Sequence, residues 1–153
     1  MKRIAHCIVG ALLAAGVGCE KSNASFVDHL AIVNISPSHG AVRVGYDSTV
    51  VVTFSGALVA DESGPTPLLP VGAACLTSLA SPPASAADPC AGEGTVGTEV
   101  EYAPSALTVT LVPDEALLPD ETYTVHLTPL LEGQDAGPLS AVVRASFRTI
   151  PTN

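Results

Sequence analysis

Histidine, serine and acidic side chains are the residues of this 153-residue sequence that could carry hydrolytic chemistry or hold a metal. Beyond the apolar N-terminal segment the histidines are His29, His39 and His126, and no carboxylate stands near them at the spacing of a hydrolase or metal site. The patterns G-x-S-x-G and H-E-x-x-H do not occur. The sequence therefore predicts no catalytic residue, no metal ligand set and no cofactor, and we expect a protein that is not an enzyme. His126 alternates with threonines, which predicts a solvated side chain.

Six residues near the middle of the chain match G-x-G-x-x-G, the pattern of dinucleotide-binding turns: Gly92-Glu93-Gly94-Thr95-Val96-Gly97. A dinucleotide site also requires a strand before the glycines and a helix after them. A proline-rich segment precedes these glycines and a predicted strand follows. We therefore expect no phosphate binding here.

Acidic residues occur in pairs, and calcium is bound by several loop carboxylates and carbonyls. A calcium-binding D-x-D-x-D-G loop is missing, so solvated surface is the simpler interpretation of these pairs. A calcium site stays an alternative. The pairs are Asp61-Glu62, Glu99 with Glu101, Asp114-Glu115, Asp120-Glu121 and Glu132 with Asp135.

The N-terminus has the layout of a secretory signal. Lys2 and Arg3 precede an apolar run over residues 4–17 that is shorter than the roughly 20 residues needed to span a bilayer. Residues 15–19, Ala-Gly-Val-Gly-Cys, resemble the lipobox of bacterial lipoproteins, in which the cysteine is lipidated after cleavage. The resemblance implies a signal peptide over residues 1–18, an acylated Cys19 and a tether over residues 19–28. The alternative is an ordinary signal peptide in which Cys19 is incidental.

The residue after the predicted lipidation site is Glu20 and not Asp. By resemblance to the sorting signals of diderm bacteria, this favours the outer membrane. The expected location is therefore a membrane outside the cytoplasm, with palmitate-type acyl chains as the attachment.

Cysteine usage agrees with this location. Cys7 lies in the predicted signal, and lipidation would consume Cys19, so Cys75 and Cys90 are left as a pair. In an oxidising compartment a disulfide is the default for such a pair. A metal pair is less suitable because the short C-x-x-C spacing and a nearby histidine are missing.

Composition bounds the remaining chain. Without Lys2 and Arg3, four basic residues stand against all 15 acidic ones, which gives a formal charge of −11. Nucleic acid is thus not an expected partner, because binding it needs a clustered basic surface. Residues 19–153 have the length of a single domain. Because aromatic residues are scarce, the core must consist of Val, Leu, Ile and Ala.

Apolar and polar residues alternate with period two in several separated segments, which is typical of half-buried strands. Turn clusters rich in Pro, Gly and Asp separate them, and no helical period follows residue 20. Short strands at this spacing predict an all-β antiparallel sandwich over residues 29–150. The predicted strands are residues 30–36, 49–54, 98–102, 106–111, 122–127 and 143–148.

Residues 61–97 break the alternation. This stretch is rich in Pro, Ala, Ser and Gly and contains Cys75 and Cys90. We predict a long loop insertion, fastened at one point, with a short strand near Cys75.

The segments flanking the insertion resemble the bacterial Ig-like domain of surface-layer and other exported proteins. The resemblance implies an Ig-like sandwich and a spacer or interaction module without a family-wide active site. The sequence departs from the family at Asp120, where Gly is common, and in the length and cysteines of the insertion. The matching residues are Ser36-Pro37, Gly40-Ala41, Val44, 50–55, 107–111, Leu117, Pro119, 123–125, 135–137, Leu139 and 146–149.

Tyr123 opens a predicted strand directly after a turn that contains Pro119. A tyrosine in this position can bury its ring and bond its hydroxyl to the backbone upstream, as in a tyrosine corner. We expect a structural role for it.

Two functions remain open. One is a structural, spacer or protein-interaction module of the bacterial envelope, with envelope or surface proteins as partners. The other is a ligand-binding or adhesion lipoprotein that uses the 61–97 loop, with or without calcium, because function concentrates in long loops on rigid sandwiches.

Overall fold

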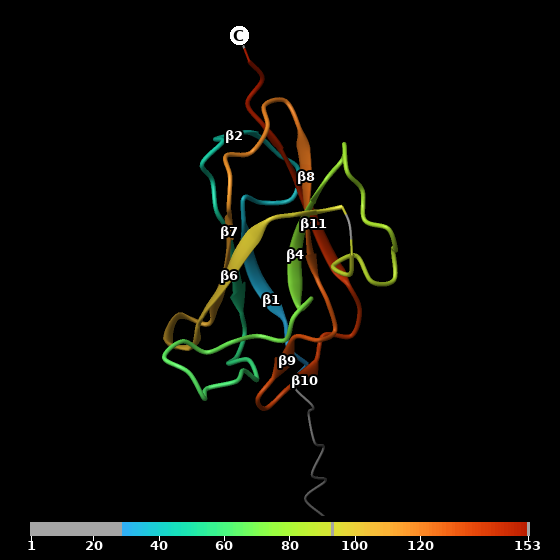
Figure 1. Ribbon diagram of the computed structural model, residues 1–153. Helices are drawn as coiled ribbons and strands as arrows, with labels where there is room; N and C mark the ends of the chain where they lie inside the picture. The colour runs from blue at the N-terminus through green and yellow to red at the C-terminus, as the bar shows by residue number, and fades with distance from the viewer. Residues whose placement is uncertain (1–28, 93, 153) are drawn as a thin grey trace, which may run out of the picture.

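A computed structural model describes residues 29–92 and 94–152, which form two β-sheets packed face to face (Figure 1). The first sheet is antiparallel and has the order β1-β3-β7-β6. Its strands are β1 (Ile32–Ser36), β3 (Val50–Phe54), β6 (Thr98–Ala103) and β7 (Thr108–Pro113). The predicted all-β sandwich is confirmed.

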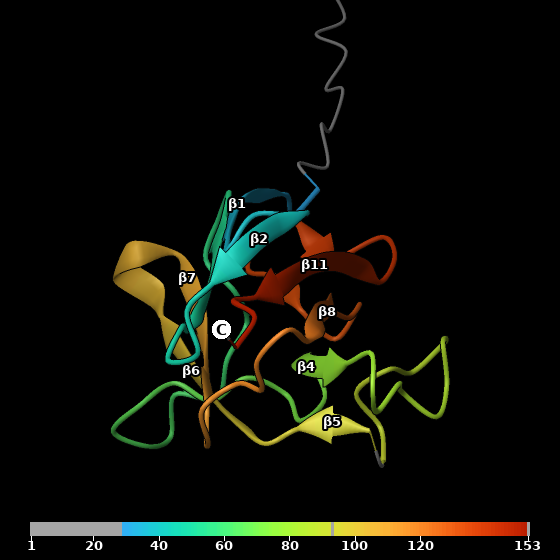
Figure 2. The ribbon, with the colours of Figure 1, turned by 90° about the horizontal axis from the view of Figure 1, so that it is seen from above.

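The second sheet has the order β2-β11-β8-β4-β5, and Figure 2 shows it beside the first. All its pairs are antiparallel except β2 with β11. The strands are β2 (Ala41–Val44), β4 (Ala74–Ser78), β5 (Thr95–Val96), β8 (Thr122–Leu127) and β11 (Val143–Thr149). A small hairpin, β9 (Glu132–Gly133) with β10 (Gly137–Pro138), closes one end, and η1 (Pro104–Ala106) is a single 3-10 turn.

The core consists of the inward positions of the alternating strands. Val50, Val52 and Phe54 of β3 meet Tyr123, Val125 and Leu127 of β8 from the other sheet in one buried cluster. Alternation thus predicted the buried face of β3, β7, β8 and β11. Leu107 is an exception, because it takes a left-handed conformation (φ 55°) after η1 and lies before β7.

The short strand expected near Cys75 is present, but residues 61–97 are not simply a loop outside the sandwich. Residues 74–78 form β4, which pairs with β8 along five residues and lies inside the second sheet, and four of those five residues are buried. The irregular described residues around β4 are therefore 57–73, which begin before the insertion, and 79–92. Within the part of the chain that the structure describes, no helix is long and apolar enough to cross a bilayer.

Asp120 occupies the position where the family commonly has Gly, and its φ of 55° explains that preference. Asp is one of the few residues with a side chain that tolerates this left-handed region. Its carboxylate also pairs with the Arg148 guanidinium at 3.0 Å. The departure from the family thus leaves the turn intact.

Tyr123 packs its ring on Phe147, with the ring centroids 5.7 Å apart. The Leu118 N–H donates a hydrogen bond of 2.8 Å to the Tyr123 hydroxyl, five residues downstream in the chain. The tyrosine therefore joins the core to the turn before β8, as its position predicts.

Tyr123→Phe should lower the free energy of unfolding by about 0.5–1.5 kcal/mol, because the ring stays buried while the Leu118 N–H loses its partner. Urea unfolding followed by circular dichroism measures the change. Tyr46→Phe is a suitable comparison, since its hydroxyl donates to the Ile150 carbonyl in a less buried position. An unchanged midpoint for Tyr123→Phe would contradict the corner.

Candidate functional groove

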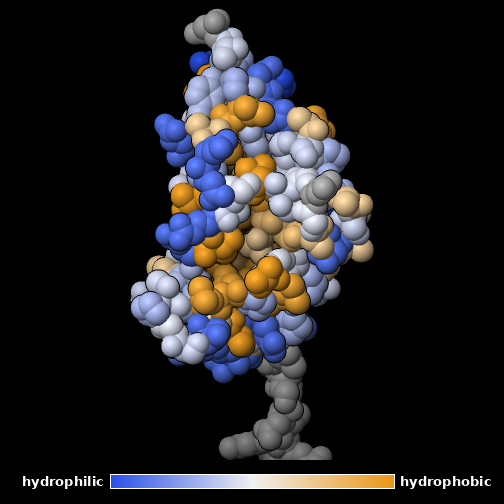
Figure 3. All heavy atoms as spheres, viewed as in Figure 1, coloured by the Kyte–Doolittle hydropathy of each residue, from blue (hydrophilic) through white to orange (hydrophobic). Residues whose placement is uncertain are grey.

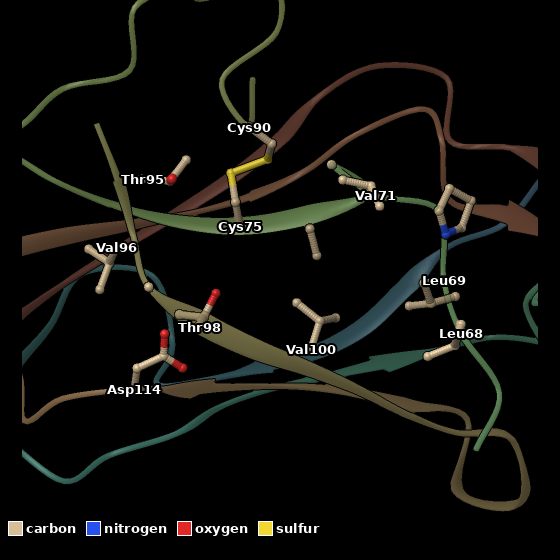
Figure 4. A pocket seen from close by; sticks show the side chains of 14 residues that line it. Leu68, Leu69, Val71, Cys75, Cys90, Thr95, Val96, Thr98, Val100 and Asp114 are labelled. Atoms are coloured by element: carbon tan, nitrogen blue, oxygen red, sulfur yellow. A yellow bond between two sulfur atoms is a disulfide. The ribbon is translucent and has the colours of Figure 1, made fainter. Parts of the chain in front are cut away.

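One hollow of the described surface lies where β5 and β6 separate. Val96 ends β5 in the second sheet and Thr98 begins β6 in the first, so the chain changes sheets at Gly97. β4 pairs with β5 at only Leu76 and Thr77. Beyond that point β4 and β6 diverge, and a groove of about 460 Å³ opens between them (Figure 4).

Most residues that line this groove, which we call the seam groove, have apolar side chains, although polar atoms contribute more than apolar atoms to its exposed surface. Val96 and Val100 come from β5 and β6, and Leu68, Leu69 and Val71 come from the segment that leads into β4. Figure 3 shows apolar side chains gathered in a hollow on this face. Thr98, Asp114 and the Cys75–Cys90 disulfide also line it. Leu68 and Val71 are 58% and 98% exposed, so they present apolar surface to solvent.

A second hollow of about 340 Å³ adjoins the seam groove and shares Leu68 and Val100 with it. It contains Glu99 and Glu101 on the outward side of β6. Apolar walls and carboxylates therefore lie along the same edge of the sandwich.

The Cys75–Cys90 disulfide forms as predicted, with the two Cα atoms 5.5 Å apart. It fastens the segment after β4 to the second sheet, and the Arg144 guanidinium adds a hydrogen bond of 2.7 Å to the Ala86 carbonyl. Together with the family shown below, the disulfide is typical of a domain outside the cytoplasm.

Two glycines of the G-x-G-x-x-G pattern, Gly94 and Gly97, lie where a Cβ would meet close neighbours. Gly94 has a φ of 100°, and a Cβ there would collide with the backbone carbonyl of Pro82. Gly97 lies against the Asp114 carboxylate at the change of sheets. β5 lies within the pattern and β6 follows it, so a strand comes after these glycines where a dinucleotide site requires a helix.

His126 corrects the prediction of a solvated side chain. It is on the outer face of β8, as period two predicts, but it is only 3% exposed. Cys75 and Arg144 are its neighbours on the adjacent strands. Nε2 lies 2.9 Å from the Thr77 hydroxyl, and Nδ1 has no hydrogen-bond partner among the described residues. Burial, with a smaller contribution from the Arg144 charge, holds the pKa of His126 below its ordinary value of 6.5.

This shift predicts a loss of stability in acid. The unfolded chain binds a proton at His126 more readily than the folded one, so stability present above pH 6.5 declines as the pH falls below it. His126→Gln keeps a neutral partner for Thr77 and should flatten the decline between about pH 7.5 and 5.5. Urea midpoints at several pH values measure the dependence of stability on pH, and His39→Gln is the control. Equal slopes for native protein and His126→Gln would refute the assignment.

The other candidate residues do not converge on one site. The His39 Nδ1 accepts a hydrogen bond from the Ser146 N–H at 3.1 Å. Asp61 accepts the Ser63 N–H at 2.9 Å, and this bond holds the pKa of Asp61 below its ordinary value. No three His, Cys, Asp or Glu side chains of the described residues form a group that could hold a metal ion. Cys19 lies outside the described residues.

Tyr102 was not singled out by the sequence patterns. Its hydroxyl accepts a hydrogen bond of 2.7 Å from the buried Leu58 N–H, which ties the start of the 57–73 segment to β6. The only available signal was its inward position in the alternation of residues 98–102.

Comparison with known proteins agrees with the fold. A family model described as bacterial Ig-like domain matches residues 27–149. PcoC, a methionine-rich copper resistance protein from Escherichia coli, is 19% identical, with 79% of this chain and 98% of that chain covered and a TM-score of 0.53. The native conformation of E. coli alpha-2-macroglobulin is 16% identical, with 81% of this chain and 6% of that chain covered and a TM-score of 0.50.

The N-terminal part of the bacterial S-layer protein SbsC is 15% identical, with 80% of this chain and 24% of that chain covered and a TM-score of 0.48. No curated protein sequence matches the chain. At these identities the structural likeness concerns the fold alone, so the copper chemistry of PcoC is not transferred to this chain.

Proposed function

The chain belongs to the family of bacterial Ig-like domains, and from this premise we propose that it is a lipid-anchored module of the bacterial envelope that binds another envelope component without catalysing a reaction. Family membership supports the envelope setting. The seam groove is the observation that carries the binding role, because it presents the exposed apolar side chains of Leu68 and Val71 together in a hollow, and grouped exposed apolar side chains mark interaction sites.

The attachment rests on Cys19 and the residues before it. Diacylglycerol together with an N-linked acyl chain would hold the protein stably at a membrane, whereas one acyl chain is marginal. Glu20 favours the outer membrane. The folded domain would then be carried by the short tether over residues 19–28.

Cys19→Ser should leave the protein unprocessed or release it from membranes, since the acyl chains are the only strong attachment after cleavage. Metabolic labelling with a palmitate analogue, followed by fractionation of the envelope, measures both effects. Unchanged labelling and fractionation would refute the lipid anchor.

The binding role can be separated from folding with paired surface variants. Leu68→Ser with Val71→Ser removes exposed apolar side chains from the seam groove. Val33→Ser with Val42→Ser removes side chains of similar exposure, 65% and 67%, from β1 and β2. We expect cross-linking in intact envelopes to lose a defined adduct only with the groove variant.

The alternative is a spacer that holds other parts apart without a specific contact. In that case the two paired variants would give the same adducts as the native protein. A circular dichroism spectrum of each variant confirms that the fold is retained.

A further inference from the structure

We infer that the seam groove takes an extended peptide segment with alternating apolar and basic residues, which adds to the free edge of β6 as a further strand. The inference rests on the proposed binding role and names the class of partner. The backbone, the apolar walls and the charges at this edge each contribute one part of the argument.

The backbone of β6 offers unpaired groups on the groove side. β6 ends the order β1-β3-β7-β6, and Asp114 donates its N–H to the Gly97 carbonyl at 2.9 Å. Bonded and non-bonded pairs alternate along antiparallel strands, so Glu99 and Glu101 also bond to β7. The backbone groups of Thr98, Val100 and Tyr102 therefore point away from β7. Pro113, which has no N–H, lies opposite Thr98 and agrees with this register.

The opposite wall also presents backbone groups. Ala73 accepts the Thr128 N–H, so by the same alternation Ala74 directs its backbone away from β8. β5 has already turned away from β4 at this level. The groove is thus bordered by two strand edges, and such edges are the usual template for an added strand.

The side chains decide what kind of strand fits. Val96, Val100 and Leu69 line the interior of the groove, so every second residue of an added strand would meet an apolar wall. The alternate residues of the added strand would point outward beside Glu99 and Glu101, which are both exposed on β6. Opposite charges on neighbouring strands stabilise a sheet, and like charges destabilise it.

Charge selects a basic partner. Asp114, Glu99 and Glu101 border the two hollows, and no arginine or lysine lines either of them. The three arginines of the described residues lie elsewhere, with Arg144 on the second sheet and Arg148 paired to Asp120. A second copy of this chain would bring its own Glu99 and Glu101 to the same edge, so self-pairing through β6 is disfavoured.

The test uses the exported protein and synthetic peptides of about seven residues, the length of a typical strand. We expect a peptide that alternates valine and lysine to bind, as measured by fluorescence anisotropy, with an affinity that falls as salt rises. A peptide that alternates valine and glutamate should bind at least about tenfold more weakly, since it places like charges beside β6. A peptide of the same composition as the first, with its valines in one block, tests the need for alternation.

Two variants test the position. Thr98→Pro removes an N–H that faces the groove and leaves the ladder to β7 intact, because proline is tolerated at the first residue of an edge strand. Binding of the valine–lysine peptide should fall about tenfold, while Thr98→Ser should bind normally. Glu99→Gln with Glu101→Gln should weaken binding and reduce its salt dependence, and Glu132→Gln with Asp135→Asn is the matched control away from the groove.

Amide hydrogen exchange gives the decisive readout. Bound peptide should slow exchange at Val100 and Tyr102 and leave Glu99 and Glu101, already bonded to β7, unchanged. Three results would overturn the inference. They are binding without this protection, equal binding of all three peptides, and protection that appears on dimerisation without peptide. The lipid anchor is not needed in these measurements, so a failed Cys19→Ser test would leave their outcome untouched.

Discussion

Leu76→Ala is expected to lower the free energy of unfolding by about 2–5 kcal/mol, the range for truncating a buried leucine in a core that collapses only partly. Leu76 is 0% exposed and lies in β4 between Val125 of β8 and Val96 of β5. Three residues further on, Leu79 is 73% exposed. Leu79→Ala should change stability by no more than about 0.5 kcal/mol.

Urea unfolding of the two variants, followed by circular dichroism, measures the difference. The comparison is matched in chemistry, because both substitutions remove the same atoms from neighbouring positions of the insertion. Equal effects would mean that β4 does not belong to the core and that residues 61–97 form a dispensable loop. The structure predicts instead that deleting residues 61–97 unfolds the domain.

The sequence predicted the strands that have one apolar and one solvated face. β3, β7, β8 and β11 alternate clearly, and the structure buries the predicted side of each. The short strand predicted near Cys75 is β4, but its place inside the second sheet could not be predicted, because both faces of Cys75 and Thr77 are covered and no alternation marks them. β2 was not predicted as a strand, since Arg43 takes a φ of 61° and interrupts it.

The candidate site could be predicted only where it depends on covalent chemistry. Counting cysteines predicted the Cys75–Cys90 pair without any knowledge of the fold. The seam groove depends on a strand that changes sheets at Gly97, and no local pattern reports which sheet a strand joins. Burial of His126 depends likewise on tertiary structure, because its neighbours Cys75 and Arg144 on the adjacent strands are tied to Cys90 and Ala86 of the segment after β4.

Removing the disulfide should have the second large effect on stability. Cys75→Ala with Cys90→Ala should lower the free energy of unfolding by about 3 kcal/mol, the chain-entropy value for closing a loop of 15 residues. The domain should still fold, because its apolar cluster draws on both sheets and on strands outside the closed loop. Chemical denaturation of the double variant measures the loss, and reduction of the native protein provides a comparison without any substitution.

The loosening should be local, and His126 reports it. With the disulfide gone, the segment keeps its bonds at Leu79 and Ala80 near its start, and the Arg144 bond to the Ala86 carbonyl further along. Water would then reach the imidazole, and the pKa of His126 should rise toward its ordinary value, because burial is the larger cause of its shift. Titration of the histidine ring signals by NMR measures this. A double variant that loses stability while the pKa of His126 stays low would show that the segment remains in place without its disulfide, and that burial of this face depends on the sandwich alone.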